Sequence, residues 1–363
     1  MQTEAAFGVG CIVPEVVGAK DVEEWKSGVH ATLEAIPAIR DLELENISRG
    51  FAPKSGITPW GESKEFTPEA GVMKFRITIP SRVQSGLRAS RKVGDTEDFI
   101  VRTYFNHRHP VTFVICDGAD ASLRTPSMSL VVVREFLKRE IGKLQGDQTR
   151  IRKLGPSPFH GNFYLAAGSQ GEQLVDGISV DVKERPGYHD FRFCYEQGST
   201  SLGNALEFVF AWLIPEISAF YRVKIDSAKR MKRATSTVGL AEGLADTYAQ
   251  RGVIAYFRRV FRNKRDLLGL RLSLLQAKLT AVNELRADED LISSVYADRS
   301  VRIIHPYTHK GLSETFEAEL ETAEKTLDIL ESQHTQEVQR VTTFCASLLG
   351  VVVGALLTAW LRR

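Results

Sequence analysis

The chain has 363 residues, of which 43% are hydrophobic and 25% are charged, with a formal net charge of +2 at pH 7. This composition is typical of folded proteins and excludes wholesale disorder, and the length suffices for two domains or for one domain with an extended element. The four cysteines are widely spaced and form no Cys-x-x-Cys pair, which favours a reducing compartment and argues against a cysteine-rich zinc site.

Residues 1–200 have the pattern of a mixed α/β domain. We expect this domain to lie in the cytosol, because the N-terminus lacks the basic and apolar segments of a secretory signal. Apolar residues at helical spacing predict helices over 20–37 and 126–145. Hairpins with few intervening helices favour an α+β sheet over a doubly wound parallel one. The strands are predicted at 72–80, 98–105, 111–117, 160–166, 177–183 and 190–195.

Residues 203–264 form a predicted basic helical region. The apolar run from Leu206 to Ile214 predicts a buried core helix that ends at Pro215 and is too short to span a bilayer. Basic residues follow, interleaved with aromatic ones, and can bind an anionic ligand or anionic lipid; nucleic acid is the less favoured partner. The simplest alternative is a solvated helix face that pairs with the glutamate-rich residues 312–340. The candidate binding residues are Arg258, Arg259, Arg262, Lys264 and Arg265.

Residues 265–340 are predicted to form a helical hairpin stalk, with a turn at 305–311. Two sets of apolar residues are spaced by four and three residues in alternation, which is the spacing of a coiled-coil-like seam. The first set is Leu268, Leu272, Leu275, Leu279 and Val282, and the second is Phe316, Leu320, Ala323, Leu327 and Leu330.

Residues 341–361 are predicted to form one C-terminal transmembrane helix. They include no charged side chain, and 21 residues make a helix of roughly 31 Å, which matches a hydrocarbon core of about 30 Å. Trp360 lies near one end, where its ring suits the membrane interface. A buried core helix is the alternative, but such a helix usually carries polar residues on one face. We therefore expect a single-pass, tail-anchored protein with most of its mass in the cytoplasm.

Small residues recur every four positions along this segment, beginning at Thr342. Small side chains allow two helices to approach closely in lipid, so this face predicts self-association. The span contains no ionisable residue, which argues against a transporter or proton relay. The predicted packing residues are Ala346, Gly350, Gly354 and Thr358.

The plan of an α/β domain, a helical stalk and a C-terminal membrane helix resembles the CorA-type divalent-cation channels over residues 265–361. That family has two membrane helices joined by a loop with a Gly-Met-Asn signature. This chain has one such helix and lacks the tripeptide. The resemblance therefore implies no ion-selective residue and no transport activity here.

Evidence for catalysis is sparse in the sequence. Asp117 ends a predicted strand and His160 lies in a proline-containing loop, and these are the candidate catalytic residues. No phosphate-binding loop, serine-nucleophile motif or metal-protease motif is present in the sequence. The pair His107 and His109 lacks a third ligand, so we expect neither a metal nor a cofactor.

These patterns favour a non-enzymatic membrane protein that works as an oligomer. Its cytosolic domain would sense or bind a ligand, and the stalk would couple that event to the membrane helix, giving a membrane effector or a channel-like assembly. Two alternatives stay open: a membrane-tethered enzyme with its active site in residues 1–200, and a membrane-held protein that binds nucleic acid or a nucleotide.

Overall fold

The computed structural model describes residues 3–51, 57–58, 61–62, 66–87, 96–106, 109–117, 126–144, 149–152, 161–168, 170–175, 177–185, 188–198, 200–252, 256, 259–260 and 263–361. The chain divides into two compact units. One, the sheet domain, comprises Met1–Ile225 and Asp290–Gly311. The other, the helical unit, comprises Asp226–Glu289 and Leu312–Arg363. Two long helices, α4 and α6, contribute residues to both units.

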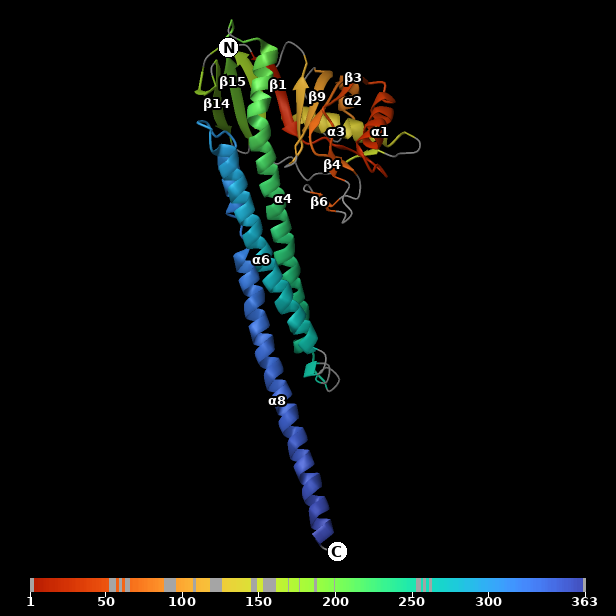
Figure 1. Cartoon of the computed structure of the whole chain (residues 1–363), viewed down its shortest axis with the longest axis vertical. Helices are drawn as coiled ribbons and strands as arrows, with labels where there is room; N and C mark the ends of the chain where they lie inside the picture. The colour runs from red at the N-terminus through yellow and green to blue at the C-terminus, as the bar shows by residue number, and fades with distance from the viewer. Residues whose placement is uncertain are drawn as a thin grey trace. The chain divides into compact units, whose positions relative to one another are not determined.

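The sheet domain is built on a nine-stranded mixed sheet with the order β13-β14-β15-β12-β1-β10-β9-β8-β3 (Figure 1). Neighbouring strands are antiparallel except β12 and β15, which are parallel. The strands are β1 (Thr3–Gly10), β3 (Ile39–Glu45), β8 (Gly71–Thr78), β9 (Asp98–Phe105), β10 (Val111–Cys116), β12 (Gly161–Ala167), β13 (Glu172–Val175), β14 (Ile178–Arg185) and β15 (Tyr188–Tyr195).

Short strands pair outside this sheet. They are β2 (Pro14–Val16) with β11 (Thr149–Ile151), β4 (Gly50–Phe51) with β7 (Thr67–Pro68), and β5 (Ile57–Thr58) with β6 (Gly61–Glu62). The six strands predicted from the sequence are present as β8, β9, β10, β12, β14 and β15, whereas β1, β3 and β13 of the main sheet are additions.

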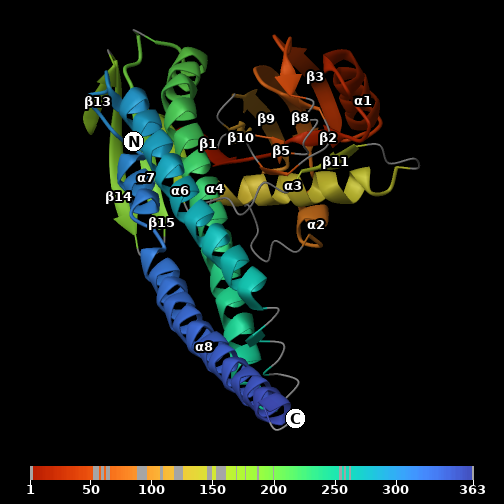
Figure 2. The ribbon, with the colours of Figure 1, turned by 60° about the horizontal axis from the view of Figure 1, so that its bottom comes forward.

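Helices cover both faces of the sheet, so its central strands are buried on both sides. On one face α1 (Val22–Glu34) and α3 (Ser127–Ile141) pack with alternate residues of β10, including Val114 and Cys116 (Figure 2). The first half of α4 (Leu202–Ala249) packs on the other face against Phe113 and its neighbours. This two-residue alternation explains why β10 is buried along its whole length. The one-turn helix α2 (Ser81–Gln84) follows β8.

Pro215 does not end the helix that contains it, as the sequence predicted, because α4 continues through it to Ala249. Proline removes one backbone hydrogen bond and costs roughly 3 kcal/mol in a helix interior. Arg299 contacts the same turn of the helix: its Nη1 atom donates to the carbonyl oxygen of Trp212, three residues before the proline, at 2.7 Å. Its guanidinium carbon also lies 4.6 Å from the centre of the Trp212 ring.

Glu216, the next residue, fixes α4 to the segment that follows α6. Its carboxylate is fully buried and accepts hydrogen bonds from the Tyr296 hydroxyl at 3.1 Å and the Ile304 amide at 2.7 Å. Arg299 Nη1 lies 2.9 Å from the same carboxylate. Burial raises the pKa of Glu216, while these hydrogen bonds and the arginine favour its charged form. The network therefore neutralises a carboxylate that would otherwise be costly inside the domain.

In the helical unit, α4 and α6 (Asn263–Tyr296) pack with α8 (Glu317–Leu361). Ion pairs show that α6 runs antiparallel to α8, because Arg271 lies 3.1 Å from Glu331 and Lys278 lies 2.6 Å from Glu324. A short helix, α7 (His305–Leu312), precedes α8. The shared core consists of Ala234, Ala241, Leu267, Leu270, Leu274, Ala277, Leu320, Ala323, Leu327 and Leu330.

The two predicted apolar seams differ in their surroundings. Four of the five residues on α8 are buried in this core, and the fifth, Phe316, packs against it. The α6 set, from Leu268 to Val282, is exposed instead, and the neighbouring positions from Leu267 to Ala277 fill the core. Among the described residues, the first set is therefore left largely uncovered.

An ion pair is buried between α4 and α6. Arg230 Nη1 lies 3.0 Å from Asp288 Oδ2, and the two side chains are 1% and 2% exposed. Arg233 of α4 also pairs with Glu284 of α6. A buried pair of this kind penalises any shift in register between the helices, because a shift would leave a charge unpaired in the core.

Replacing Glu216 by alanine should lower the free energy of unfolding by about 3 kcal/mol or more, because it strands Arg299 in the domain. Urea unfolding of the full chain in detergent, followed by tryptophan fluorescence, measures this. The control is Glu207→Ala on the same helix, which breaks an exposed pair with Arg102 and should cost less than about 1 kcal/mol. Equal losses in the two variants would contradict the role of Glu216.

His109 should make the sheet domain acid-sensitive. It is fully buried with its ring 4.5 Å from that of Tyr221, and burial lowers its pKa from 6.5 to about 3. The unfolded chain therefore takes up a proton first, so the contribution of His109 is complete above pH 6.5 and is lost as pH falls toward 3. Between pH 6 and 4, His109→Phe should gain stability relative to the wild type by about 1.4 kcal/mol per pH unit. A difference that stays constant with pH would contradict this.

Candidate functional site

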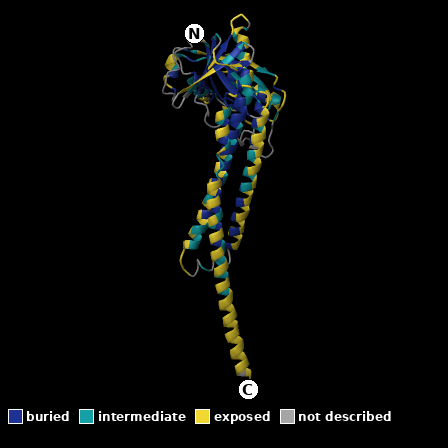
Figure 3. Ribbon diagram, turned by 90° about the vertical axis from the view of Figure 1, so that its left-hand side faces the viewer, coloured by how far each residue is buried: buried dark blue, intermediate teal, exposed yellow. Residues whose placement is uncertain are grey.

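The strongest functional candidate is the C-terminal half of α8, which extends beyond the packed core. The helix is continuous from Glu317 to Leu361 and contains no proline. Its first half packs with α4 and α6, whereas its second half is exposed along its whole length (Figure 3). One continuous helix is therefore packed against other helices in its first half and exposed in its second half.

Among the described residues, one helix is long and apolar enough to cross a membrane, and none of its apolar window is buried. The core helix of a soluble protein would be mostly buried, so this exposure favours a lipid environment. Large apolar side chains lie on every side of the segment. They are Phe344, Leu348, Leu349, Val351, Val352, Val353, Leu356, Leu357, Trp360 and Leu361. These findings support a single-pass membrane protein with its span at the C-terminus.

The predicted packing residues all lie on this exposed segment. A Cβ atom added at Gly350 or Gly354 would meet no atom within 4 Å, so the space beside both glycines is open. Thr358 donates to the carbonyl oxygen of Gly354 at 2.7 Å, and Thr342 donates to that of Val338 at 2.9 Å. Their hydroxyls are satisfied within the helix and need no water, which suits a lipid environment.

The basic residues meet α8 just before the apolar segment. Arg259 Nε lies 2.9 Å from the carboxylate of Glu337, four residues before Val341. The same guanidinium donates to the carbonyl oxygen of Gln250 at 2.6 Å, close to the end of α4. Arg259 therefore links the end of α4 to the start of the predicted span, and the pair is largely buried at 11% and 18% exposure.

The other basic candidates are exposed wherever the structure describes them. Lys264 and Arg265 are exposed in the first turn of α6. Arg258 and Arg262 lie outside the described residues. Arg340 is exposed on α8, three residues after Glu337. Exposed positive charge thus lies next in sequence both to Arg259 and to the apolar segment.

Of the two candidate catalytic residues, the structure describes Asp117. Asp117 follows β10, is half exposed, and its Oδ2 atom lies 3.7 Å from Arg76 Nη1. His160 lies outside the described residues, as does His107. Within the described ranges, no group of three or more histidine, cysteine, aspartate or glutamate residues is placed to hold a metal ion.

Sequence reasoning missed Glu216 and the Arg230–Asp288 pair. One signal for Glu216 was available, because it is the one charged residue in the largely apolar stretch from Phe208 to Tyr221. No comparable signal marks Asp288, which lies among other acidic residues. Comparison of the chain with family models, with curated proteins and with solved structures finds no match.

Proposed function

We propose that this chain is a C-terminally anchored membrane protein whose sheet domain binds a ligand in the cytosol and whose helical unit couples that event to the membrane helix. The chains self-associate, and the output is a change in how the membrane helices pack, as in a membrane effector or a channel-like assembly. The observation that carries this proposal is the continuity of α8 from the packed core into the apolar segment.

Continuity matters because a simple tether does not require it. A flexible linker would uncouple the anchor from the domain, whereas a helix transmits rotation and translation along its axis. In the proposed stalk, α6 and α8 form an antiparallel hairpin joined by the ion pairs of Arg271 and Lys278. Any movement of this hairpin would reach the small-residue face at Gly350 and Gly354, because the same helix carries both.

The membrane helix favours packing rather than solute binding. Its described residues include no ionisable side chain from Val341 to Leu361 other than Cys345. In lipid, association depends on close packing and small residues supply the surface for it. We therefore assign the self-association face to Ala346, Gly350, Gly354 and Thr358.

Replacing Gly350 and Gly354 together by leucine should weaken self-association by about tenfold or more, because the added side chains hold the two backbones apart. Light scattering of the full chain in detergent, over a range of protein concentrations, measures the oligomer mass. The matched control is Cys345→Leu with Val352→Leu, which adds bulk on the opposite side of the same helix. An unchanged oligomer in the glycine variant would refute the packing face.

The basic residues next to the span are proposed to bind anionic lipid headgroups. The Arg259–Glu337 pair lies about 6 Å along α8 from Val341, where the hydrocarbon region would begin. Lys264 and Arg265 follow Arg259 closely in the chain and are exposed. Basic residues near a bilayer surface each contribute about 1 kcal/mol to the attraction of anionic lipid.

Replacing Lys264 and Arg265 by alanine should therefore lower the affinity for phosphatidylglycerol by about 2 kcal/mol, which is roughly thirtyfold. Native mass spectrometry of the full chain in mixed detergent micelles, titrated with phosphatidylglycerol or phosphatidylcholine, measures this. Lys232→Ala with Lys325→Ala removes the same charge from exposed sites elsewhere in the helical unit and serves as the control. Equal loss in both variants would show only a general charge effect and would reject the site.

A further inference from the structure

The exposed face of α6 has a continuous line of large apolar side chains. These five side chains, defined here as the leucine stripe, are 46–64% exposed and are Leu268, Leu272, Leu275, Leu279 and Val282. The residues that pack inside the helical unit, from Leu267 to Ala277, lie about 140° away around the same helix, at 100° per residue. One face of α6 therefore faces the core, and a second apolar face is left open.

The spacing of the leucine stripe indicates what kind of surface would cover it. Steps of four and three residues in alternation keep side chains on one side of a helix over about 21 Å, which is two heptads. The shape that fits such a line is another helix with the same spacing. Elsewhere in the described part of the chain, outside the apolar segment of α8, the other exposed large apolar residues are single: Val17, Val182, Phe208, Met231, Leu240 and Ile329.

Charge around the leucine stripe suits contact with an identical surface. One flank has uncharged residues at Gly269, Gln276 and Asn283. The other flank has Arg271 and Lys278, and both are paired with acidic residues of α8, at 3.1 Å from Glu331 and 2.6 Å from Glu324. Between Leu268 and Val282, two copies of this face could therefore meet without like charges opposing one another, since the cations beside that stretch are paired within each chain and the exposed Lys264, Arg265 and Arg286 lie beyond its two ends.

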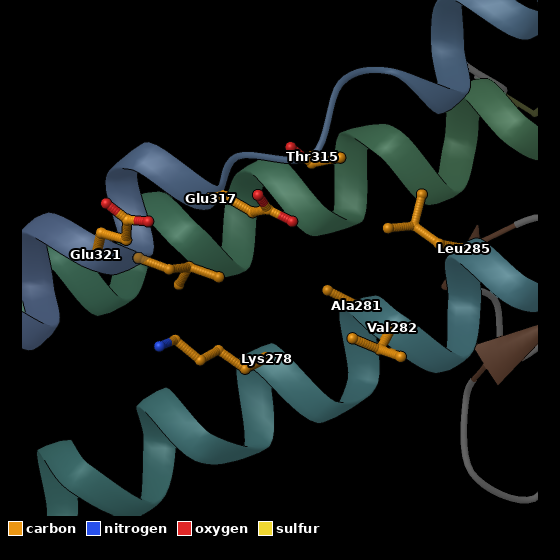
Figure 4. A pocket seen from close by; sticks show the side chains of 8 residues that line it. Lys278, Ala281, Val282, Leu285, Thr315, Glu317 and Glu321 are labelled. Atoms are coloured by element: carbon orange, nitrogen blue, oxygen red, sulfur yellow. The ribbon is translucent and has the colours of Figure 1, made fainter.

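A small groove opens beside the end of the leucine stripe. It measures about 260 Å³ and lies between α6 and α8 (Figure 4). Val282 belongs to both the groove and the stripe, and Ala281, Leu285 and Leu320 add apolar lining. Glu317 and Glu321 border it from α8. The stripe therefore ends in a hollow rather than on a flat polar surface, which extends the apolar contact available to a second helix.

We infer that the leucine stripe is a self-association surface, on which α6 of one chain pairs with α6 of a second copy in parallel and in register. The parallel orientation rests on the proposed membrane anchor, because α8 would hold every copy in the same direction and at the same height above the bilayer. Under that constraint Leu275 of one chain meets Leu275 of its copy. The helical unit and the membrane helix then supply two separate contacts between the same two chains.

Disulfide cross-linking tests the register. The full chain with Cys345→Ala is reconstituted into phosphatidylcholine vesicles, and Leu275→Cys is compared with Asp266→Cys, an exposed site on the other side of α6. After mild oxidation, the cross-linked fraction for the Leu275 variant should exceed that for the Asp266 variant by about tenfold or more. Equal cross-linking at the two sites, or none at Leu275, would overturn the proposal.

Oligomer mass separates this surface from the membrane face. Leu272→Glu with Leu279→Glu should reduce association by about tenfold or more, with the melting temperature unchanged because both residues are exposed. Ala287→Glu, at another exposed site on α6, is the control. If only the stripe variant loses oligomer mass, the leucine stripe is retained and the membrane face is overturned. If only the Gly350 and Gly354 variant loses mass, the membrane face is retained and the leucine stripe is overturned. Loss in both supports two contacts, and a wild-type monomer overturns both.

Discussion

A single helix, α8, has to suit two solvents, and the organisation of the helical unit depends on that requirement. From Leu320 to Leu330 it buries one face against α4 and α6 and leaves its other face polar. From Val341 to Leu361 it has no charged side chain, and none of its described residues is buried. In water the second pattern is unfavourable, since roughly 25 cal/mol is lost for each Å² of apolar surface left exposed. In lipid the same surface costs nothing, and the backbone is satisfied within the helix.

The polar contacts of the helical unit explain how one helix can change environment without losing its position. Arg259 pairs with Glu337, near the end of the polar part of α8. Arg271 and Lys278 pair with acidic residues closer to the N-terminus of the same helix. The pairs of Arg271 and Lys278 are partly exposed, so each contributes little to the free energy of folding. The buried Arg230–Asp288 pair differs, because a slip of one turn would strand both charges in the core. Apolar packing thus provides the stability, and that pair restricts the register.

A feature of this structure could be predicted from the sequence where the residues that determine it lie within one segment of the chain. The apolar segment, six strands of the sheet and α3 follow from spacing and composition, which are visible in one segment at a time. The orientation of α6 is different, because Leu267 and Leu268 both belong to apolar sets and only the position of α4 and α8 decides which set is buried. Pro215 is similar, since local rules end the helix there, whereas α4 continues through it in a turn that Arg299, 84 positions later in the sequence, also contacts. Asp117 has no partner acid or base that spacing could reveal.

Two weak contacts on one rigid rod can do what neither does alone. The middle of the leucine stripe lies level with about Leu327 of α8, given the pairing of Lys278 with Glu324, and Gly350 is a further 23 residues along the same helix. That separation is roughly 35 Å. Once the membrane faces of two chains meet, the stripes are held at a high effective concentration, so the second contact forms within the pair at little entropic cost. The converse also holds: a ligand that twists the helical unit would misalign the stripes and strain the membrane contact, because α8 contains no break to absorb the rotation. In the proposed assembly, a movement of the helical unit would then reach the membrane contact through the rigid helix α8, and no ionisable residue inside the span would be needed.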